Sequence, residues 1–170
     1  KIVLYGWRTL KRAVQSLSLH GLNRYLERNM KKTVLVVDDD KTDVMAIQRA
    51  LKNMVRKNEI EVEVFYDGDE VIARLKDAPA IEAYSDSPVP YIMFLDLNMP
   101  KMDGLEVLEL VRNDPKLKSM VIFVLTTSSN PIDVKKAYQQ CIAGYLVKSE
   151  QGNRYEKLGD LVQSYSNAVI

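Results

Sequence analysis

The stretch YIMFLDLNMPKMDG, residues 91–104, decides the fold. It is an apolar run that stops at Asp96 and passes into a turn, with Pro90 before it and Pro100 within it. An uninterrupted apolar run of this length is typical of a strand covered on both faces, as in parallel sheets. Asp96 is therefore predicted at the carboxyl end of a buried strand. In open α/β sheets, ligands bind and reactions occur at that edge.

Four further apolar segments are predicted to be strands, at residues 34–37, 62–66, 121–125 and 144–147. Apolar residues at three- and four-residue intervals predict helices at 44–54, 71–75, 104–111, from Pro131 onward, and at 155–165. Five strands that alternate with five helices predict an α/β fold with a doubly wound parallel sheet, because parallel strands need crossover connections.

Charge divides the chain into two parts. Residues 1–30 hold six Lys or Arg against one Glu, which gives +5, whereas the whole chain has a formal net charge of +1. Within this basic part, apolar residues at helical spacing predict an amphipathic helical extension: Trp7, Leu10, Val14 and Leu17. We expect a domain boundary near Met30, with one globular domain over residues 31–170.

Composition limits the function and location of the protein. A net charge of +1 argues against direct nucleic-acid binding, and with the chain ending at Ile170 we expect no DNA-binding output domain. No apolar run approaches the roughly 18 residues of a transmembrane helix. The single Cys141 suits a reducing compartment, so we expect a cytoplasmic protein, and we predict Cys141 as a small buried residue on the helix before Gly144.

Polar residues stand at the predicted strand ends: Asp38, Asp39 and Asp40 after the first strand, Asp96 after the third, Thr126 after the fourth and Lys148 after the fifth. Two carboxylates about 4 Å apart repel by roughly 4 kcal/mol at an effective dielectric of about 20, so the group calls for a cation. Mg²⁺ fits, because it prefers few carboxylates and bridges to phosphoryl oxygens. A carboxylate beside Mg²⁺, with Lys and hydroxyl groups nearby, predicts phosphoryl transfer to an aspartate.

A carboxylate after a strand can instead cap the next helix. This simpler interpretation is favoured for Asp40 and Asp103, and Asp69 and Glu70 are expected at a solvated helix start. Met99 and Met102 are expected to pack within the loop.

Residues 31–170 resemble a response-regulator receiver domain of two-component signalling, which implies a flavodoxin-like strand order 2-1-3-4-5. The resemblance implies Asp96 as the phosphorylated residue, with Lys148 and Thr126 as its catalytic partners. It implies Mg²⁺ held by Asp38, Asp39, Asp96 and the Asn98 carbonyl, with Asp39 a direct ligand. It also implies a conformational switch made of Thr126 and Tyr145.

The function implied is a stand-alone response regulator, not an enzyme in its own right. It would take a phosphoryl group from a sensor histidine kinase or phosphotransfer protein and bind a downstream protein, with a homodimer possible. The long loop at 77–90 is similar to that of small regulators associated with phytochromes. Two positions depart from the family pattern: Ser149 follows the lysine where proline is common, and Thr127 stands where Ala or Gly is frequent.

Two other functions are alternatives to this one. An aspartate-nucleophile, Mg²⁺-dependent phosphatase would want a second acid two residues after the nucleophile, where Asn98 stands, and a cap insertion after Asp96. A non-phosphorylated interaction module would not need the complete set of strand-end residues. A dinucleotide-binding protein would carry G-x-G-x-x-G after the first strand, and none is there.

Overall fold

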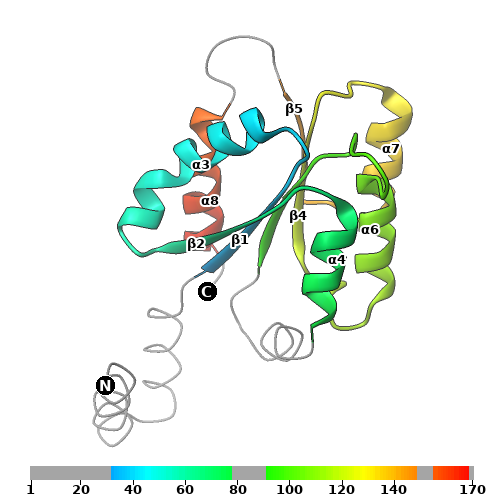
Figure 1. Ribbon diagram of the computed structural model, residues 1–170, viewed down its shortest axis with the longest axis horizontal. Coiled ribbons are helices and arrows are strands. Elements are labelled where there is room, and N and C mark those ends of the chain that lie inside the picture. Colours follow the sequence, from blue (N-terminus) through cyan, green and yellow to red (C-terminus); the bar gives the residue numbers. More distant parts are fainter. Residues whose placement is uncertain (1–31, 78–90, 149–154, 169–170) are drawn as a thin grey trace, which may run out of the picture. The chain divides into compact units, whose positions relative to one another are not determined.

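The computed structural model describes residues 32–77, 91–148 and 155–168 (Figure 1). Strands and helices alternate through these ranges in the order β1 (Lys32–Val37), α3 (Lys41–Arg56), β2 (Ile60–Phe65), α4 (Gly68–Lys76), β3 (Ile92–Leu95), α6 (Gly104–Asn113), β4 (Val121–Thr126), α7 (Pro131–Gln139), β5 (Gly144–Val147) and α8 (Glu156–Ala168). The predicted alternation of strands and helices is confirmed.

All neighbouring strands of the sheet are parallel, in the order β2-β1-β3-β4-β5, which confirms the flavodoxin-like topology. The last residues of the strands are in register: Val37 lies beside Leu95, and Thr126 beside Val147. The residues that follow the strands therefore emerge at one edge of the sheet.

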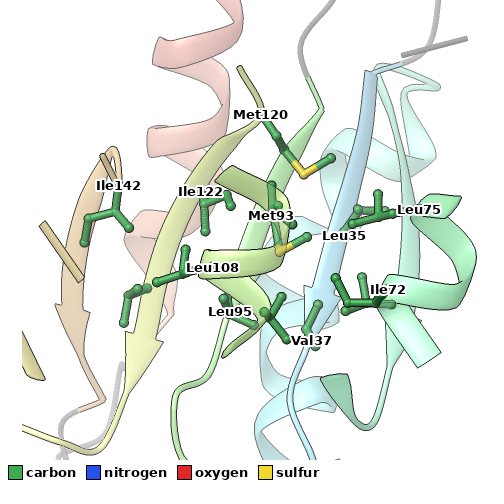
Figure 2. Close-up of a cluster of buried hydrophobic side chains, with 14 of the residues drawn as sticks. Leu35, Val37, Ile72, Leu75, Met93, Leu95, Leu108, Met120, Ile122 and Ile142 are labelled. Carbon is green, nitrogen blue, oxygen red and sulfur yellow. The ribbon is translucent and has the colours of Figure 1, made fainter. Parts of the chain in front are cut away.

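Helices cover both faces of the sheet, α3 and α8 on one side and α4, α6 and α7 on the other (Figure 1). Successive residues of a strand point to opposite faces, so β1 sends Leu35 and Val37 into one core and Val34 and Val36 into the other. Figure 2 shows the first of these cores, where Met93 and the neighbouring strand residues meet helices α4 and α6. Burial on both faces explains why these strands read as continuous apolar runs.

Four of the described helices begin at short polar side chains that accept a hydrogen bond from a backbone N–H of the first turn. Asp40 caps α3, Asp67 caps α4 and Asn130 caps α7, while Asp103 forms a capping box with Glu106 at α6. The capping roles predicted for Asp40 and Asp103 are confirmed, and Pro131 opens α7 as expected.

The prediction for Cys141 is wrong. This residue is exposed, and it lies beyond the end of α7 with φ 52°, in the left-handed region. The chain turns out of the helix here, with the Cys141 N–H bonded to the Tyr138 carbonyl at 3.1 Å, and Ile142 takes the buried position. The bounds of one strand also differ. A strand was predicted at residues 62–66, whereas β2 runs from Ile60 to Phe65, and Tyr66 lies beyond it and is exposed.

Three predictions fall outside the described residues: the helical extension at 1–30, the loop at 78–90, and the peptide between Lys148 and Ser149. Met99 is buried and Met102 packs against the same core, as expected. None of the helices in the described ranges is both long and apolar enough to cross a membrane.

The loop after β3 is held tightly to the strand that it leaves. The Gly104 N–H donates to the Leu97 carbonyl at 3.0 Å, and a Cβ on Gly104 would lie only 2.2 Å from the Asp96 carbonyl oxygen. That oxygen belongs to the backbone and has no flexible side chain to move. Glycine at 104 therefore lets α6 start directly beside Asp96.

Replacing Gly104 with Ala should lower the free energy of unfolding by about 3 kcal/mol or more, because the backbone of the loop must move to admit the methyl group. Urea denaturation followed by circular dichroism measures the change. Gly159→Ala is the matched control. A Cβ on Gly159 would lie 3.3 Å from the Ala50 carbonyl oxygen, so we expect the free energy of unfolding to change by no more than about 1 kcal/mol. Equal stability of the two variants would contradict the steric argument.

Candidate functional site

Four of the residues singled out from the sequence follow or end neighbouring strands. Asp38 comes directly after β1, Asp96 after β3 and Lys148 after β5, while Thr126 is the last residue of β4. All four are buried. Their backbones are tied into the sheet, since the Asp96 N–H donates to the Val37 carbonyl at 2.9 Å and the Lys148 N–H to the Thr126 carbonyl at 2.7 Å.

The Lys148 ammonium group joins these strand ends. Its Nζ atom lies 2.7 Å from an Asp38 carboxylate oxygen and 2.7 Å from an Asp96 carboxylate oxygen. A third carboxylate, Asp43 in the first turn of α3, approaches the same nitrogen at 3.0 Å. The Lys148 side chain is 1% exposed, so these contacts are shielded from solvent. Within the described chain, one buried cation therefore faces three buried carboxylates.

The charges at this site shift the protonation equilibria. Burial raises the pKa of Asp38 to about 6, against the lowering effect of its hydrogen bond to Lys148. Burial also disfavours the charged form of Lys148, but its contacts with Asp38 and Asp96 outweigh that cost and raise its pKa. Because carboxylates outnumber cations here, we expect Lys148 to stay charged. We expect the ionised form of Asp38 to be destabilised when no metal is bound.

Three carboxylates could hold a metal ion at this edge. Oxygen atoms of Asp38, Asp39 and Asp96 all lie within 4.8 Å of one another, and Asp39 is the exposed member. Carboxylate oxygens are hard ligands of the kind that Mg²⁺ and similar divalent cations prefer, and the excess negative charge favours a cation there. The donor set therefore fits a divalent metal, with the exposed Asp39 on the side open to solvent.

The loop that follows Asp96 is hydrogen-bonded to the loop that begins at Thr126. The Asn98 side-chain amide donates to the Thr126 and Thr127 hydroxyls, at 3.3 Å each, and the Asn98 N–H donates to an Asp96 carboxylate oxygen at 3.1 Å. Asn98 thus bridges the two loops beside the carboxylate.

Tyr145 on β5 contacts the loop after β4 through its hydroxyl group. This hydroxyl donates to the Ser128 carbonyl at 3.0 Å, and the Ser128 N–H donates to the Thr126 hydroxyl at 3.3 Å. The Tyr145 ring is half-buried and packs against the core on the side of α4, α6 and α7. A chain of contacts therefore runs from Thr126 to Tyr145 through one loop.

Two buried polar residues at the site were not predicted from the sequence. Asp43 reaches Lys148, and Tyr155, directly before α8, buries its hydroxyl group. A signal for Asp43 exists: it lies four residues before the buried Ile47, so it continues the apolar stripe of α3. A carboxylate on the buried face of a helix needs a buried partner. Tyr155 gives no such signal, because tyrosine is common in cores.

Comparison with known proteins agrees with this arrangement. The model of the response regulator receiver domain matches residues 34–158, which is more than half of the chain. The chain belongs to this family. It is therefore a receiver domain of two-component signalling. The resemblance inferred from its motifs is confirmed.

Curated relatives of this receiver domain include response regulators from bacteria. Response regulator Rcp1 of Synechocystis is 35% identical over 139 residues, which are 82% of this chain and 91% of Rcp1. Chemotaxis protein CheY1 of Helicobacter pylori is 30% identical over 115 residues, which are 68% of this chain and 83% of CheY1.

Solved structures of receiver proteins resemble this one in fold. The Mn²⁺-bound form of Rcp1 has a TM-score of 0.66 at 35% identity, covering 79% of this chain and 93% of that one. The phosphorylated cyanobacterial phytochrome response regulator RcpA has a TM-score of 0.68 at 31% identity, covering 83% and 97%.

The raised pKa of Asp38 predicts how metal-free stability depends on pH. Because the folded-state pKa of about 6 exceeds the ordinary value of 3.8, the folded protein binds the extra proton more readily than the unfolded chain does. The stabilising effect of this proton is present below the ordinary pKa and is lost as pH rises through about 6. Asp38→Asn, which mimics the neutral acid, should therefore raise the free energy of unfolding by roughly 2 kcal/mol near pH 8 and add nothing near pH 4.

Urea denaturation in the presence of a chelator, at both pH values, measures this difference. Asp69→Asn changes an exposed carboxylate in the first turn of α4 and serves as the control, with no comparable gain expected at the higher pH. Loss of stability in Asp38→Asn near pH 8 would mean that the pairing with Lys148 outweighs the cost of burial.

Proposed function

We propose that the chain is a response regulator that accepts a phosphoryl group on Asp96 from the phosphohistidine of a sensor histidine kinase or phosphotransfer protein. The observation that carries this proposal is the buried Lys148 ammonium, 2.7 Å from the Asp96 carboxylate and 2.7 Å from that of Asp38. Asp96 is the carboxylate that faces the lysine, the possible metal ligands and the Thr126 loop together.

The metal in this proposal is Mg²⁺, held by Asp38, Asp39, Asp96 and the carbonyl oxygen of Asn98. The clustering of the three carboxylates supports the first three ligands, and the short loop from Asp96 to Asn98 supports the fourth. Bound there, Mg²⁺ would offset the negative charge shared by Asp96 and the incoming phosphoryl group.

In the transfer step, an Asp96 carboxylate oxygen attacks phosphorus and forms an acyl phosphate. The bond from phosphorus to the donor imidazole nitrogen breaks, and its electron pair stays on that nitrogen, which is then protonated by solvent. The Lys148 ammonium and the Thr126 hydroxyl bind phosphoryl oxygens and stabilise the charge on the transferring group. The chain itself contributes a nucleophile and donors, and it turns over no external substrate.

The switch in this proposal starts at Thr126. In the structure its hydroxyl accepts hydrogen bonds from Asn98 and Ser128, at 3.3 Å each, and these would be exchanged for a phosphoryl oxygen. Movement of the same loop would alter the contact of Ser128 with Tyr145. Phosphorylation would thus shift the population of Tyr145 positions and change the surface of α7, β5 and α8 that a downstream protein, or a second copy of the chain, binds.

Two other functions remain as alternatives. A phosphatase with an aspartate nucleophile would need a general acid two residues after Asp96, and the Asn98 amide cannot give up a proton in that role. An interaction module without phosphorylation would have no need for a buried Lys148 against three carboxylates, an arrangement that is costly to bury.

For the rest of the molecule, we propose that residues 31–170 form the signalling domain and residues 1–30 an accessory extension that is not needed for phosphorylation. The charge difference between the two parts supports this division. We propose that the protein acts in the cytoplasm without binding nucleic acid directly, as its partners in the proposed chemistry are proteins.

Asp96→Asn should take up no phosphoryl group, because an amide oxygen is a poor nucleophile and its nitrogen cannot form the acyl phosphate. Intact mass spectrometry after incubation with acetyl phosphate and Mg²⁺ measures the labelling, and the unmodified chain should gain one phosphoryl group. Asp69→Asn, at an exposed position in the first turn of α4, is the control and should still be labelled. Stoichiometric labelling of Asp96→Asn would refute the assignment of the phosphoacceptor.

Thr127→Gly should shorten the lifetime of the acyl phosphate by about 3- to 10-fold, a factor that corresponds to roughly 1 kcal/mol in the barrier. The expected reason is access of water: the Thr127 hydroxyl accepts a hydrogen bond from the Asn98 amide at 3.3 Å, and Asn98 in turn bonds the Asp96 carboxylate, so glycine at 127 would remove a side chain next to this contact. Loss of the phosphoryl group over time is followed by mass spectrometry. Thr127→Ser keeps the hydroxyl, so its acyl phosphate should be lost more slowly than that of the glycine variant. Equal rates of loss in all three proteins would show that this side chain does not limit the access of water to the acyl phosphate.

A further inference from the structure

The Lys148 ammonium group lies against three carboxylates, with hydrogen bonds to Asp38 and Asp96 and an ion pair with Asp43. An ammonium group has three N–H donors, and Asp38, Asp96 and Asp43 lie 2.7, 2.7 and 3.0 Å from the nitrogen. The three acids come from the ends of β1 and β3 and from the first turn of α3. The ammonium group therefore connects three separate segments of the chain.

The proposed chemistry would redirect two of these three contacts. Asp38 and Asp96 belong to the cluster that could hold a metal ion, and Asp96 would also carry the phosphoryl group. Asp43 is not part of that cluster among the described residues, although it is as close to Lys148 as a direct ion pair requires. Asp43 is thus the carboxylate that can keep its contact with Lys148 before, during and after transfer.

The surroundings of Asp43 favour such a fixed role. Asp43 is buried, and it lies on a helix whose buried face is anchored in the core by Val44 and Ile47. A rigid helix places its carboxylate more reproducibly than the loop residues do.

Tyr155 is a second buried polar residue near Asp43. The Tyr155 side chain is 5% exposed, and its hydroxyl has no hydrogen bond of ordinary geometry within the described chain. Burial and, after it, the nearby Asp43 carboxylate raise the pKa of this hydroxyl. A buried hydroxyl group, at the residue directly before α8, is therefore the nearby group that could support Asp43.

We propose that Asp43 is a positioning residue for phosphoryl transfer, which acts through Lys148 and is itself supported by Tyr155. It keeps the Lys148 ammonium group at the strand edge while Asp38 and Asp96 turn to the metal and the phosphoryl group. Asp43 touches neither the metal nor phosphorus. This inference rests on the proposed function, because it assigns a role within phosphoryl transfer to Asp96.

The test compares rates of Asp96 phosphorylation by acetyl phosphate at saturating Mg²⁺, measured by intact mass, in the full chain. Asp43→Asn keeps the shape of the side chain but removes its charge, and it should slow transfer by between about 10- and 100-fold, as is usual when a supporting partner of a reactive group is lost. Tyr155→Phe removes only the hydroxyl and should slow transfer by about 2- to 5-fold. Asp69→Asn makes the same change at an exposed carboxylate in the first turn of α4, which is not among the ion-pair partners of Lys148, and should leave the rate unchanged.

Two further readouts separate positioning from a merely structural role. The Mg²⁺ concentration that gives half-maximal rate should change by less than about 3-fold in Asp43→Asn, because the metal ligands remain. In a double-mutant cycle, adding Asp43→Asn to Lys148→Ala should slow transfer no further, because Asp43 acts only through the lysine.

The outcomes distinguish this inference from the function on which it rests. If the unmodified chain takes up no phosphoryl group, the proposed function itself fails. If that chain is phosphorylated and Asp43→Asn keeps its rate, or if the two substitutions slow transfer additively, the role of Asp43 is refuted and the function stands. Should Asp43→Asn not fold, Asp43→Glu takes its place, since it keeps the charge but shifts the oxygens, and an unchanged rate in that variant would refute the role equally.

Discussion

The buried ammonium group of Lys148 is the interaction on which the rest of the site depends. It contacts Asp38, which lies 110 residues away along the chain, and Asp96, which lies 52 residues away. Through Asp43 it also holds the start of α3. A single cation thus fixes the relative positions of β1, β3 and β5 at their carboxyl ends, and the parallel sheet in turn presents these ends at one edge.

The buried carboxylates around Lys148 are expected to cost the folded state free energy. Three carboxylates around one lysine leave an excess of negative charge in a place shielded from water. Burial and, to a smaller extent, the charge of Asp96 raise the pKa of Asp38. Buried ion pairs seldom stabilise a fold more than apolar residues would. An excess of buried anions that a divalent cation and a phosphoryl group could rebalance is better explained by function, as strained sites often are. Two hydrogen bonds, from Ser128 to Thr126 and from Tyr145 to Ser128, connect the same site to β5.

The sequence predicted the parts of this molecule that depend on local pattern. Strands buried on both faces read as apolar runs, and the acids, hydroxyl and lysine that follow them mark the sheet edge, so Asp38, Asp96, Thr126 and Lys148 could be found without coordinates. Asp43 was missed although it continues the apolar stripe of α3, because its partner Lys148 lies more than 100 residues away and the local pattern does not reveal their contact. The error at Cys141 has a similar cause: the helix ends two residues earlier than its pattern implies, and the turn that follows exposes the thiol.

The most direct test of the account is a crystal structure of the chain with Mg²⁺ and beryllofluoride, which binds to carboxylates in the shape of a phosphoryl group. The account predicts beryllium on an Asp96 oxygen, Mg²⁺ between Asp38, Asp39 and Asp96, and the Lys148 ammonium on a fluorine atom. It also predicts that Lys148 keeps its contact with Asp43. Beryllofluoride on another residue, or a Lys148 side chain still bound to Asp38 and Asp96 with no contact to fluorine, would contradict the central claim that this lysine organises the site for phosphoryl transfer.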